Sequence, residues 1–262
     1  MAVDNYYDEN IISMIDSWSK PLPTMMLCGK TGSGKKNICD YISNKFNLEC
    51  VDITDSLTLD TIESINMAVF PKLYTIDTSK ISIKEQNTIL KFLEEPLANA
   101  YIVLLCSNIS YVLDTVKNRC IIYYIKQYSQ EELIKYSNSD TDIDIKLKLA
   151  ETPGQMLSLN SLNVSELYDF AFKVIDKIKV ANVVNALISI PAKVAFKNEQ
   201  DKFDFELFCK ALLVVCKEKM VSDKDFNINY YKLTNRLYND INIPNIKREM
   251  LFENYILDIK GV

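Results

Sequence analysis

The chain has 262 residues, of which 48% are hydrophobic and 25% charged, a balance typical of a folded globular protein rather than a disordered one. Its net charge of −5 argues against a globally basic nucleic-acid binder and leaves DNA contact to a local patch or to partners. There is no histidine, and the seven cysteines lack C-x-x-C spacing, so we expect no zinc site and reduced, mostly buried thiols. The polar N-terminus and the lack of an apolar run of about 18 residues predict a cytoplasmic protein that does not span a membrane.

Residues 8–18 carry apolar side chains at helical spacing and predict a short amphipathic helix. After two prolines, apolar runs of strand length alternate with helical patterns as far as residue 125. We expect strands at residues 24–28, 48–53, 73–77, 100–107 and 120–125, and helices at 37–46, 58–70, 82–96 and 111–118. This alternation predicts an α/β core in which helices cover both faces of a parallel sheet.

From residue 126 onward the sequence shows helical patterns and no strand pattern. The clearest breaks fall near residue 126 and near residues 160–164. We therefore expect three parts: an α/β core at 1–125, a small helical part at 126–163 and a larger all-helical part at 164–262.

A glycine-rich segment, GKTGSGKK at 29–36, lies between the first predicted strand and the helix that follows it. In this context the glycines let backbone N–H groups converge on phosphate oxygens, and Lys35 would reach the β- and γ-phosphates of ATP or ADP. Lys36 stands where a working P-loop has the Ser or Thr that binds Mg²⁺, and its ammonium would repel the metal. The predicted nucleotide-binding residues of this loop are Gly29, Gly32, Gly34, Lys35 and Lys36.

The strand predicted at 73–77 ends in Asp77, the position at which a Walker B strand helps to hold Mg²⁺. AAA+ ATPases place a glutamate next, to polarise the attacking water, but here the next residue is Thr78, a poor base. Two parts of the hydrolytic machinery are thus altered, which favours an inactive site. Taken alone, Asp77 has another interpretation, an ordinary strand-end residue that caps the next turn.

Three further pieces follow in order: EQNTILKFLEEP at 85–96, IVLLCSN at 102–108 and TVKNRC at 115–120. Together they resemble the delta-prime family of bacterial DNA polymerase III clamp loaders, and more broadly the clamp-loader AAA+ proteins. The resemblance covers about residues 22–158 and includes AETPGQM at 150–156, which is similar to the lid segment of the family. The resemblance implies that the three parts of the chain are an AAA+ core, a helical lid and a collar that joins subunits.

The same resemblance assigns roles to single residues. It implies that Arg119 reaches into the ATP site of a neighbouring subunit as an arginine finger in trans, whereas a plain surface ion pair is the other interpretation. It places Asn108 at the sensor 1 position, which contacts nucleotide in active members. Gln155 stands where active members carry a sensor arginine, and the zinc module of many delta-prime chains is missing.

The preferred hypothesis is a non-hydrolysing clamp-loader subunit in DNA replication, a stator that supplies Arg119 to an ATPase neighbour in a hetero-oligomer. Its partners would be the other loader subunits and, through the complex, a sliding clamp and primer-template DNA. Two alternatives remain. One is an active AAA+ ATPase subunit of a phage-like loader, whose turnover Lys35→Ala would abolish. The other is a P-loop regulatory switch outside replication.

Overall fold

The computed structural model describes residues 6–20, 22–66, 69–94, 99–139, 141–180, 194–195, 203–224, 226–241 and 247–261. The chain forms two compact units. Unit 1 comprises Met1–Tyr136 and Glu151–Leu157, and unit 2 comprises Ser137–Ala150 and Ser158–Val262. The division into core, lid and collar stays a prediction.

Unit 1 is built around a five-stranded sheet with the strand order β2-β3-β4-β1-β5, in which each adjacent pair is parallel. The strands are β1 (Met25–Cys28), β2 (Glu49–Asp52), β3 (Lys72–Asp77), β4 (Ala100–Cys106) and β5 (Ile121–Tyr124). Parallel neighbours cannot be joined by tight hairpins, so the chain must cross over between strands, and it does so mainly through helices. The predicted α/β core with a parallel sheet is therefore confirmed.

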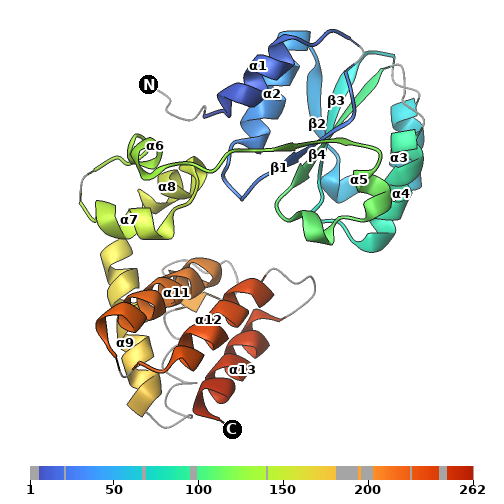
Figure 1. Cartoon of the computed structure of the whole chain (residues 1–262). Helices are drawn as coiled ribbons and strands as arrows, with labels where there is room; N and C mark the ends of the chain where they lie inside the picture. The colour runs from blue at the N-terminus through green and yellow to red at the C-terminus, as the bar shows by residue number, and fades with distance from the viewer. Residues whose placement is uncertain are drawn as a thin grey trace. The chain divides into compact units, whose positions relative to one another are not determined.

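Helices cover both faces of this sheet, with α1 and α2 on one face and α3, α4 and α5 on the other (Figure 1). Their bounds are α1 (Glu9–Asp16), α2 (Lys35–Phe46), α3 (Leu59–Asn66), α4 (Ile83–Glu94) and α5 (Asp114–Lys117). Successive side chains of a strand point to opposite faces. Accordingly, Met25 and Leu27 of β1 join the buried cluster under α1 and α2, whereas Met26 and Cys28 join the cluster under the other helices.

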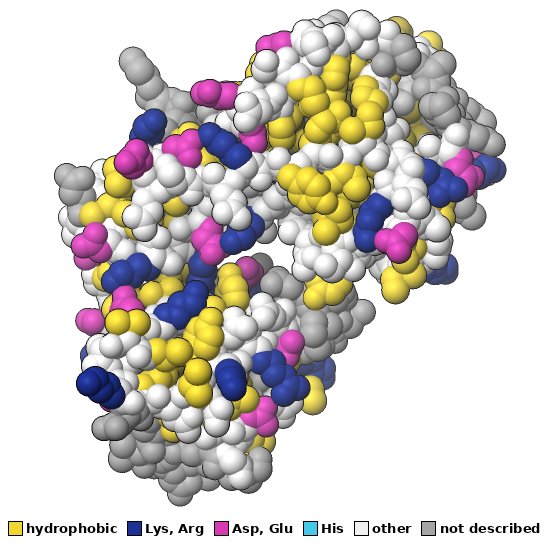
Figure 2. Space-filling view, viewed as in Figure 1, with side chains coloured by type: hydrophobic (Ala, Val, Ile, Leu, Met, Phe, Trp, Pro, Cys, Tyr) yellow, Lys and Arg dark blue, Asp and Glu magenta, His cyan; other side chains and the backbone are white. Residues whose placement is uncertain are grey.

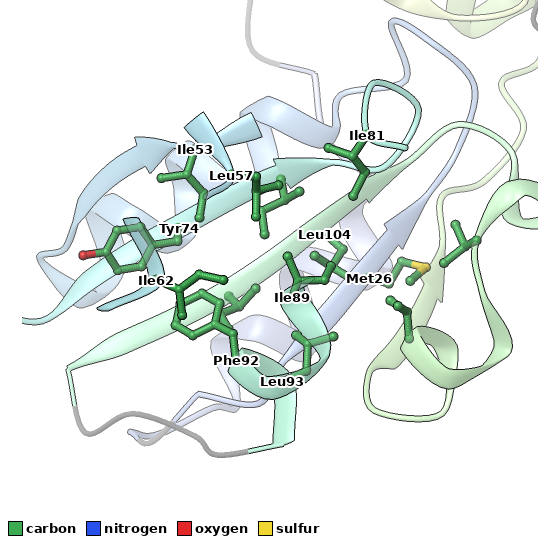
Figure 3. Close-up of a cluster of buried hydrophobic side chains, with 14 of the residues drawn as sticks. Met26, Ile53, Leu57, Ile62, Tyr74, Ile81, Ile89, Phe92, Leu93 and Leu104 are labelled. Carbon is green, nitrogen blue, oxygen red and sulfur yellow. The ribbon is translucent and has the colours of Figure 1, made fainter. Parts of the chain in front are cut away.

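Figure 3 shows the cluster between the sheet and α3 and α4. Ile89 and Phe92 of α4 lie in it together with Leu104 of β4, and the ring of Phe92 meets that of Tyr74 edge-on at 6.3 Å between centroids. Burying an aliphatic or aromatic side chain of this size contributes about 1.5–3 kcal/mol relative to leaving it exposed. This packing fixes α4 on the sheet, and with it the position of Glu94, the last residue of the helix.

Helix α4 begins with a capping box, and Gln86 within it bonds to the residues that lead into α5. In this capping box, Ser82 N–H donates to Glu85 Oε2 at 2.7 Å and Glu85 N–H donates to Ser82 Oγ at 3.3 Å. The helix predicted over 111–118 is instead divided into a 3₁₀ turn, η2 (Ile109–Tyr111), and α5. Leu113 N–H donates to the side-chain Oε1 of Gln86 at 2.9 Å, so a tertiary hydrogen bond takes the place of a helical one.

Unit 2 is mainly helical in its described residues, as predicted for the second half of the chain. Its helices include α7 (Ile143–Leu149), α9 (Val164–Val180), α11 (Phe205–Ser222), α12 (Ile228–Asp240) and α13 (Arg248–Lys260), whereas α6 (Gln130–Ile134) belongs to unit 1 and α8 (Pro153–Leu159) begins there. Phe205 and Phe208 of α11 pack on Phe252 of α13, with ring centroids 5.9 and 6.0 Å away. Two short strands, β6 (Val194–Ala195) and β7 (Phe203–Asp204), pair in parallel and were not predicted, because two residues carry no readable period.

Candidate functional site

The glycine-rich segment forms the turn between β1 and α2, at the edge where the parallel strands end. Gly32 and Gly34 have φ angles of 77° and 95°, which only glycine adopts without strain. Gly29 N–H donates to Cys106 O of β4 at 2.9 Å and ties the turn to the sheet. Because α2 starts directly after the turn, its free N–H groups and positive dipole end suit an anion there. Strand, turn and helix follow in the predicted order, while the nucleotide-binding role of the loop stays a prediction.

Lys35 does not extend away from this loop. Its Nζ donates to the carbonyl oxygens of Gly29 and Lys30, the latter at 3.0 Å. Burial lowers the pKa of Lys35, and the nearby charge of Asp77 opposes that effect. A phosphate at this loop would therefore have to draw the ammonium away from the carbonyls that now hold it.

The chain itself packs against the outer side of the loop. Gly154 N–H donates to Gly32 O at 2.9 Å, and Thr152 Oγ1 donates to Thr31 O at 2.9 Å. An ion pair between Lys30 Nζ and Glu151 Oε2 at 2.7 Å adds to these contacts. The segment around residues 151–155, which resembles the lid of the family, thus bonds directly to the P-loop within unit 1.

Two tyrosines that belong to no sequence motif complete the cover of the loop. Tyr128 Oη donates to Ser33 O at 2.9 Å. Tyr6 lies so close that a Cβ on Gly34 would come within 2.6 Å of Tyr6 O, and a Cβ on Gly154 within 2.4 Å of Tyr6 Oη. Isolated tyrosines outside a motif carry no positional signal in one sequence, so only the folded chain could reveal them.

The residues at the metal position do not suit Mg²⁺. Lys36 Nζ lies 3.8 Å from Asp52 Oδ2 at the end of β2. The lysine ammonium therefore lies beside Asp52, which with Asp77 is one of the two carboxylates near the loop. Asp77 Oδ1 accepts hydrogen bonds from Ser79 N–H at 3.1 Å and from Ser79 Oγ at 2.6 Å, as in a strand-end cap. Within the described residues no group of three or more acidic or cysteine side chains could hold a metal ion.

The position that would polarise water is closed. Thr78 is only 4% exposed, and both its N–H and its Oγ1 donate to Leu105 O, at 2.9 and 3.1 Å. Asn108, at the end of the neighbouring strand, accepts from Ser110 N–H at 3.0 Å and caps η2. Thr78 is thus not positioned as a base toward an attacking water, and the side-chain oxygen of Asn108 is engaged within its own turn.

Arg119 lies near the N-terminal ends of the strands, whereas the P-loop lies at their C-terminal ends. β5 runs parallel to β1 with Ile121 beside Met25 and Tyr124 beside Cys28, so Arg119 comes just before the strand starts while the P-loop follows where β1 ends. Four residues of strand span about 13 Å. The arginine is therefore remote from the loop of its own chain, and the two predicted parts of the site do not come together within one chain.

The side chain of Arg119 is held at both terminal nitrogens. One donates to Thr115 O at 2.7 Å, and the other donates to Glu94 Oε1 at the end of α4 in an ion pair. The side chain remains 33% exposed. No local sequence pattern links the arginine to its carboxylate partner, because the two residues are 25 positions apart.

The sheet order, the glycine-rich turn after β1 and the aspartate at the end of β3 define a P-loop protein of the AAA+ type. Solved structures share this fold. They include a DNA polymerase III gamma subunit-related protein from Thermotoga maritima, with 14% identity, a TM-score of 0.50, and coverage of 97% of this chain and 98% of that one. The RuvB Holliday junction branch migration motor from Thermotoga maritima has 14% identity and a TM-score of 0.50, with 98% of this chain and 82% of that chain covered.

A sequence match narrows the class. Residues 70–129 match the family described as DNA polymerase III, delta subunit, and this stretch contains Asp77, Asn108 and Arg119 but not the P-loop. No curated protein matches the sequence significantly. The chain thus has a fold of the AAA+ type, and within it residues 70–129 are similar to a DNA polymerase III family.

Proposed function

We propose that this chain is a delta-prime-type subunit of a clamp loader that does not hydrolyse ATP and supplies Arg119 to the ATP site of a neighbouring subunit. The observation that carries the proposal is the place of Arg119, at the sheet edge opposite its own P-loop. An arginine there cannot reach the P-loop of its own chain. It could enter the ATP site of a neighbouring subunit that packs against that end of the sheet.

The composition of the chain supports the choice of this residue. Of the 30 lysines and arginines only three are arginines, and Arg119 is the one that falls within the residue ranges of unit 1. A guanidinium is planar, always charged and able to bond two phosphate oxygens at once, whereas an ammonium acts as a point charge. Unit 1 otherwise uses lysine and carries its one arginine in the stretch that matches the polymerase III family.

The altered P-loop supports the absence of hydrolysis. Lys36 forms an ion pair with Asp52, and Thr78 Oγ1 donates to a backbone carbonyl. Gln155 Oε1 accepts a hydrogen bond from Glu151 N–H at 2.9 Å. ATP or ADP at this loop would lack a Mg²⁺ partner and a general base. The geometry favours a loop that fastens the segment at residues 151–155 over one that turns over nucleotide.

The proposal includes a hetero-oligomer in which the helical part at 164–262 acts as a collar, with the lid at 126–163. Exposed apolar side chains support contact with other subunits, because such patches mark interaction surfaces. Figure 2 shows apolar side chains gathered on the viewed face of unit 1. Ile121 and Tyr124 of the edge strand β5 are among the exposed large apolar residues, at 47% and 67%. A sliding clamp and primer-template DNA would be reached through the complex.

The test is ATP turnover by the purified chain alone and in a binary mixture with the clamp-loader ATPase encoded in the same genome. We expect no turnover alone, and in the mixture a loss of at least about 100-fold in kcat with Arg119→Ala, since fingers contribute about 10³–10⁵. Lys72→Ala is the matched control, because Lys72 also begins a strand at this edge, is 32% exposed and forms an ion pair with Glu49. Turnover by the chain alone, lost with Lys35→Ala, would instead support the active-ATPase alternative.

A further inference from the structure

The ion pair between Glu94 and Arg119 joins two elements that the chain brings together from distant positions. Glu94 is the last residue of α4, and Arg119 lies in the turn between α5 and β5. Glu94 engages one terminal nitrogen of the guanidinium and Thr115 O engages the other. Arginine has five N–H donors, so a bound phosphate could still take the others.

The elements that carry Glu94 and Arg119 are held together by further contacts. Gln86, 2% exposed, donates from Nε2 to Tyr111 O at 3.0 Å and accepts from Leu113 N–H at 2.9 Å, which ties α4 to the residues that lead into α5. Leu93 of α4 and Val116 of α5 are buried in the same apolar cluster. The carboxylate therefore approaches the guanidinium from the end of a helix that is packed on the sheet.

Stabilisation of the fold is not a sufficient explanation for the pair. The two side chains are 50% and 33% exposed, and ion pairs at such exposure contribute little to folding. A long arginine side chain loses much rotamer freedom when it is held in one direction. Holding the side chain in one direction is useful where its positive charge has to face a negative charge that develops during a reaction.

We propose that Glu94 is a positioning residue, which holds the Arg119 guanidinium in the direction in which it meets the phosphates at the neighbouring subunit's ATP site. This inference rests on the proposed function. Glu94 itself touches neither nucleotide nor the reacting atoms. Its contribution is the orientation of Arg119, so an amide at the same position should replace most of it, while a methyl group should not.

The first experiment uses the full chain in the binary mixture with the ATPase subunit. We expect Glu94→Ala to lower kcat about tenfold, and Glu94→Gln to stay within about threefold of the wild type, with an unchanged KM for ATP and unchanged affinity between the subunits. In the background of Arg119→Ala, Glu94→Ala should cause no further loss, because a positioning residue has nothing left to position. Glu49→Ala, which removes another exposed ion-paired carboxylate of unit 1, is the matched control and should leave kcat unchanged.

A second measurement needs no partner. The chain has three arginines, so the side-chain Nε–Hε region of its NMR spectrum holds three signals, and Arg119→Ala assigns one of them. We expect ¹⁵N relaxation to show a less ordered Arg119 side chain in Glu94→Ala and a largely preserved one in Glu94→Gln. The melting temperature should move by less than about 3 °C in both variants.

The outcomes separate this inference from the function on which it rests. If Arg119→Ala lowers turnover but Glu94→Ala does not, or if their losses multiply in the double variant, Glu94 does not position the arginine and the finger remains. Equal order of Arg119 in wild type and Glu94→Ala would also overturn the inference. If Arg119→Ala leaves turnover unchanged, the proposed function fails, and the role of Glu94 fails with it.

Discussion

The contact between the P-loop and residues 152–155 predicts a specific response to Gly32→Ala. An alanine at a φ of 77° costs about 1–2 kcal/mol, of which about 0.4–1 kcal/mol is offset by the stiffer unfolded chain. Its Cβ would also lie 2.8 Å from Thr152 Oγ1 and 3.0 Å from Gln155 N, so the backbone of the segment has to move.

Movement of the segment has a further cost. It would break the hydrogen bond from Gly154 N–H to Gly32 O and the one from Thr152 Oγ1 to Thr31 O, at about 1 kcal/mol each. We therefore expect Gly32→Ala to destabilise unit 1 by about 2–4 kcal/mol. Asn47→Ala is the control, since it places an alanine at a φ of 51° on the exposed end of α2 and should cost only about 1 kcal/mol.

Urea unfolding followed by tryptophan fluorescence measures this difference. Trp18 is the single tryptophan of the chain, and its ring lies 6.1 Å from that of Tyr123 in β5, so its signal reports on unit 1. Equal losses of stability in Gly32→Ala and Asn47→Ala would refute the reasoning, because the close approach of the segment to the loop would then contribute nothing.

Two further predictions use the same fluorescence assay. Gln86→Leu should destabilise unit 1 by about 2–4 kcal/mol, because Tyr111 O and Leu113 N–H lose their buried partner, and a loss below about 1 kcal/mol would contradict this. The hydrogen bond from Lys126 lowers the pKa of Glu132, so the stabilisation by Glu132 is complete above its unfolded pKa of about 4.3 and is lost as the pH falls. Glu132→Gln should therefore weaken the decline in stability between about pH 5 and pH 3, and an unchanged decline would exclude this ion pair as its source.

Much of unit 1 could be predicted from the sequence, because the information is local. A run such as AYIVLLCS at 100–107 is apolar on both faces and reads as a central parallel strand, and the structure shows β4 in the middle of the sheet. The turn after β1 is indicated by its closely spaced glycines, because a tight loop requires glycine at such positions. The capping box at Ser82 and Glu85 is likewise a pattern within four residues.

Other features depend on which distant segments pack together. The helix pattern over 111–118 is interrupted where Leu113 N–H donates to Gln86 Oε1, 27 residues earlier in the chain. The cover of the P-loop by Tyr6 and by the segment near Gly154 joins residues from opposite ends of unit 1. No local pattern encodes such contacts, since each depends on the approach of two surfaces whose sequences vary independently.

The candidate site divides in the same way. The sequence alone indicated Arg119, Lys36 and Thr78 as the residues that bear on the site, because each stands at a fixed offset within a motif. Only the tertiary structure placed Arg119 at the sheet edge opposite its own P-loop and beside Glu94. Strand register decides the first of these facts and helix packing the second, and both are set by the burial of side chains far apart in the chain.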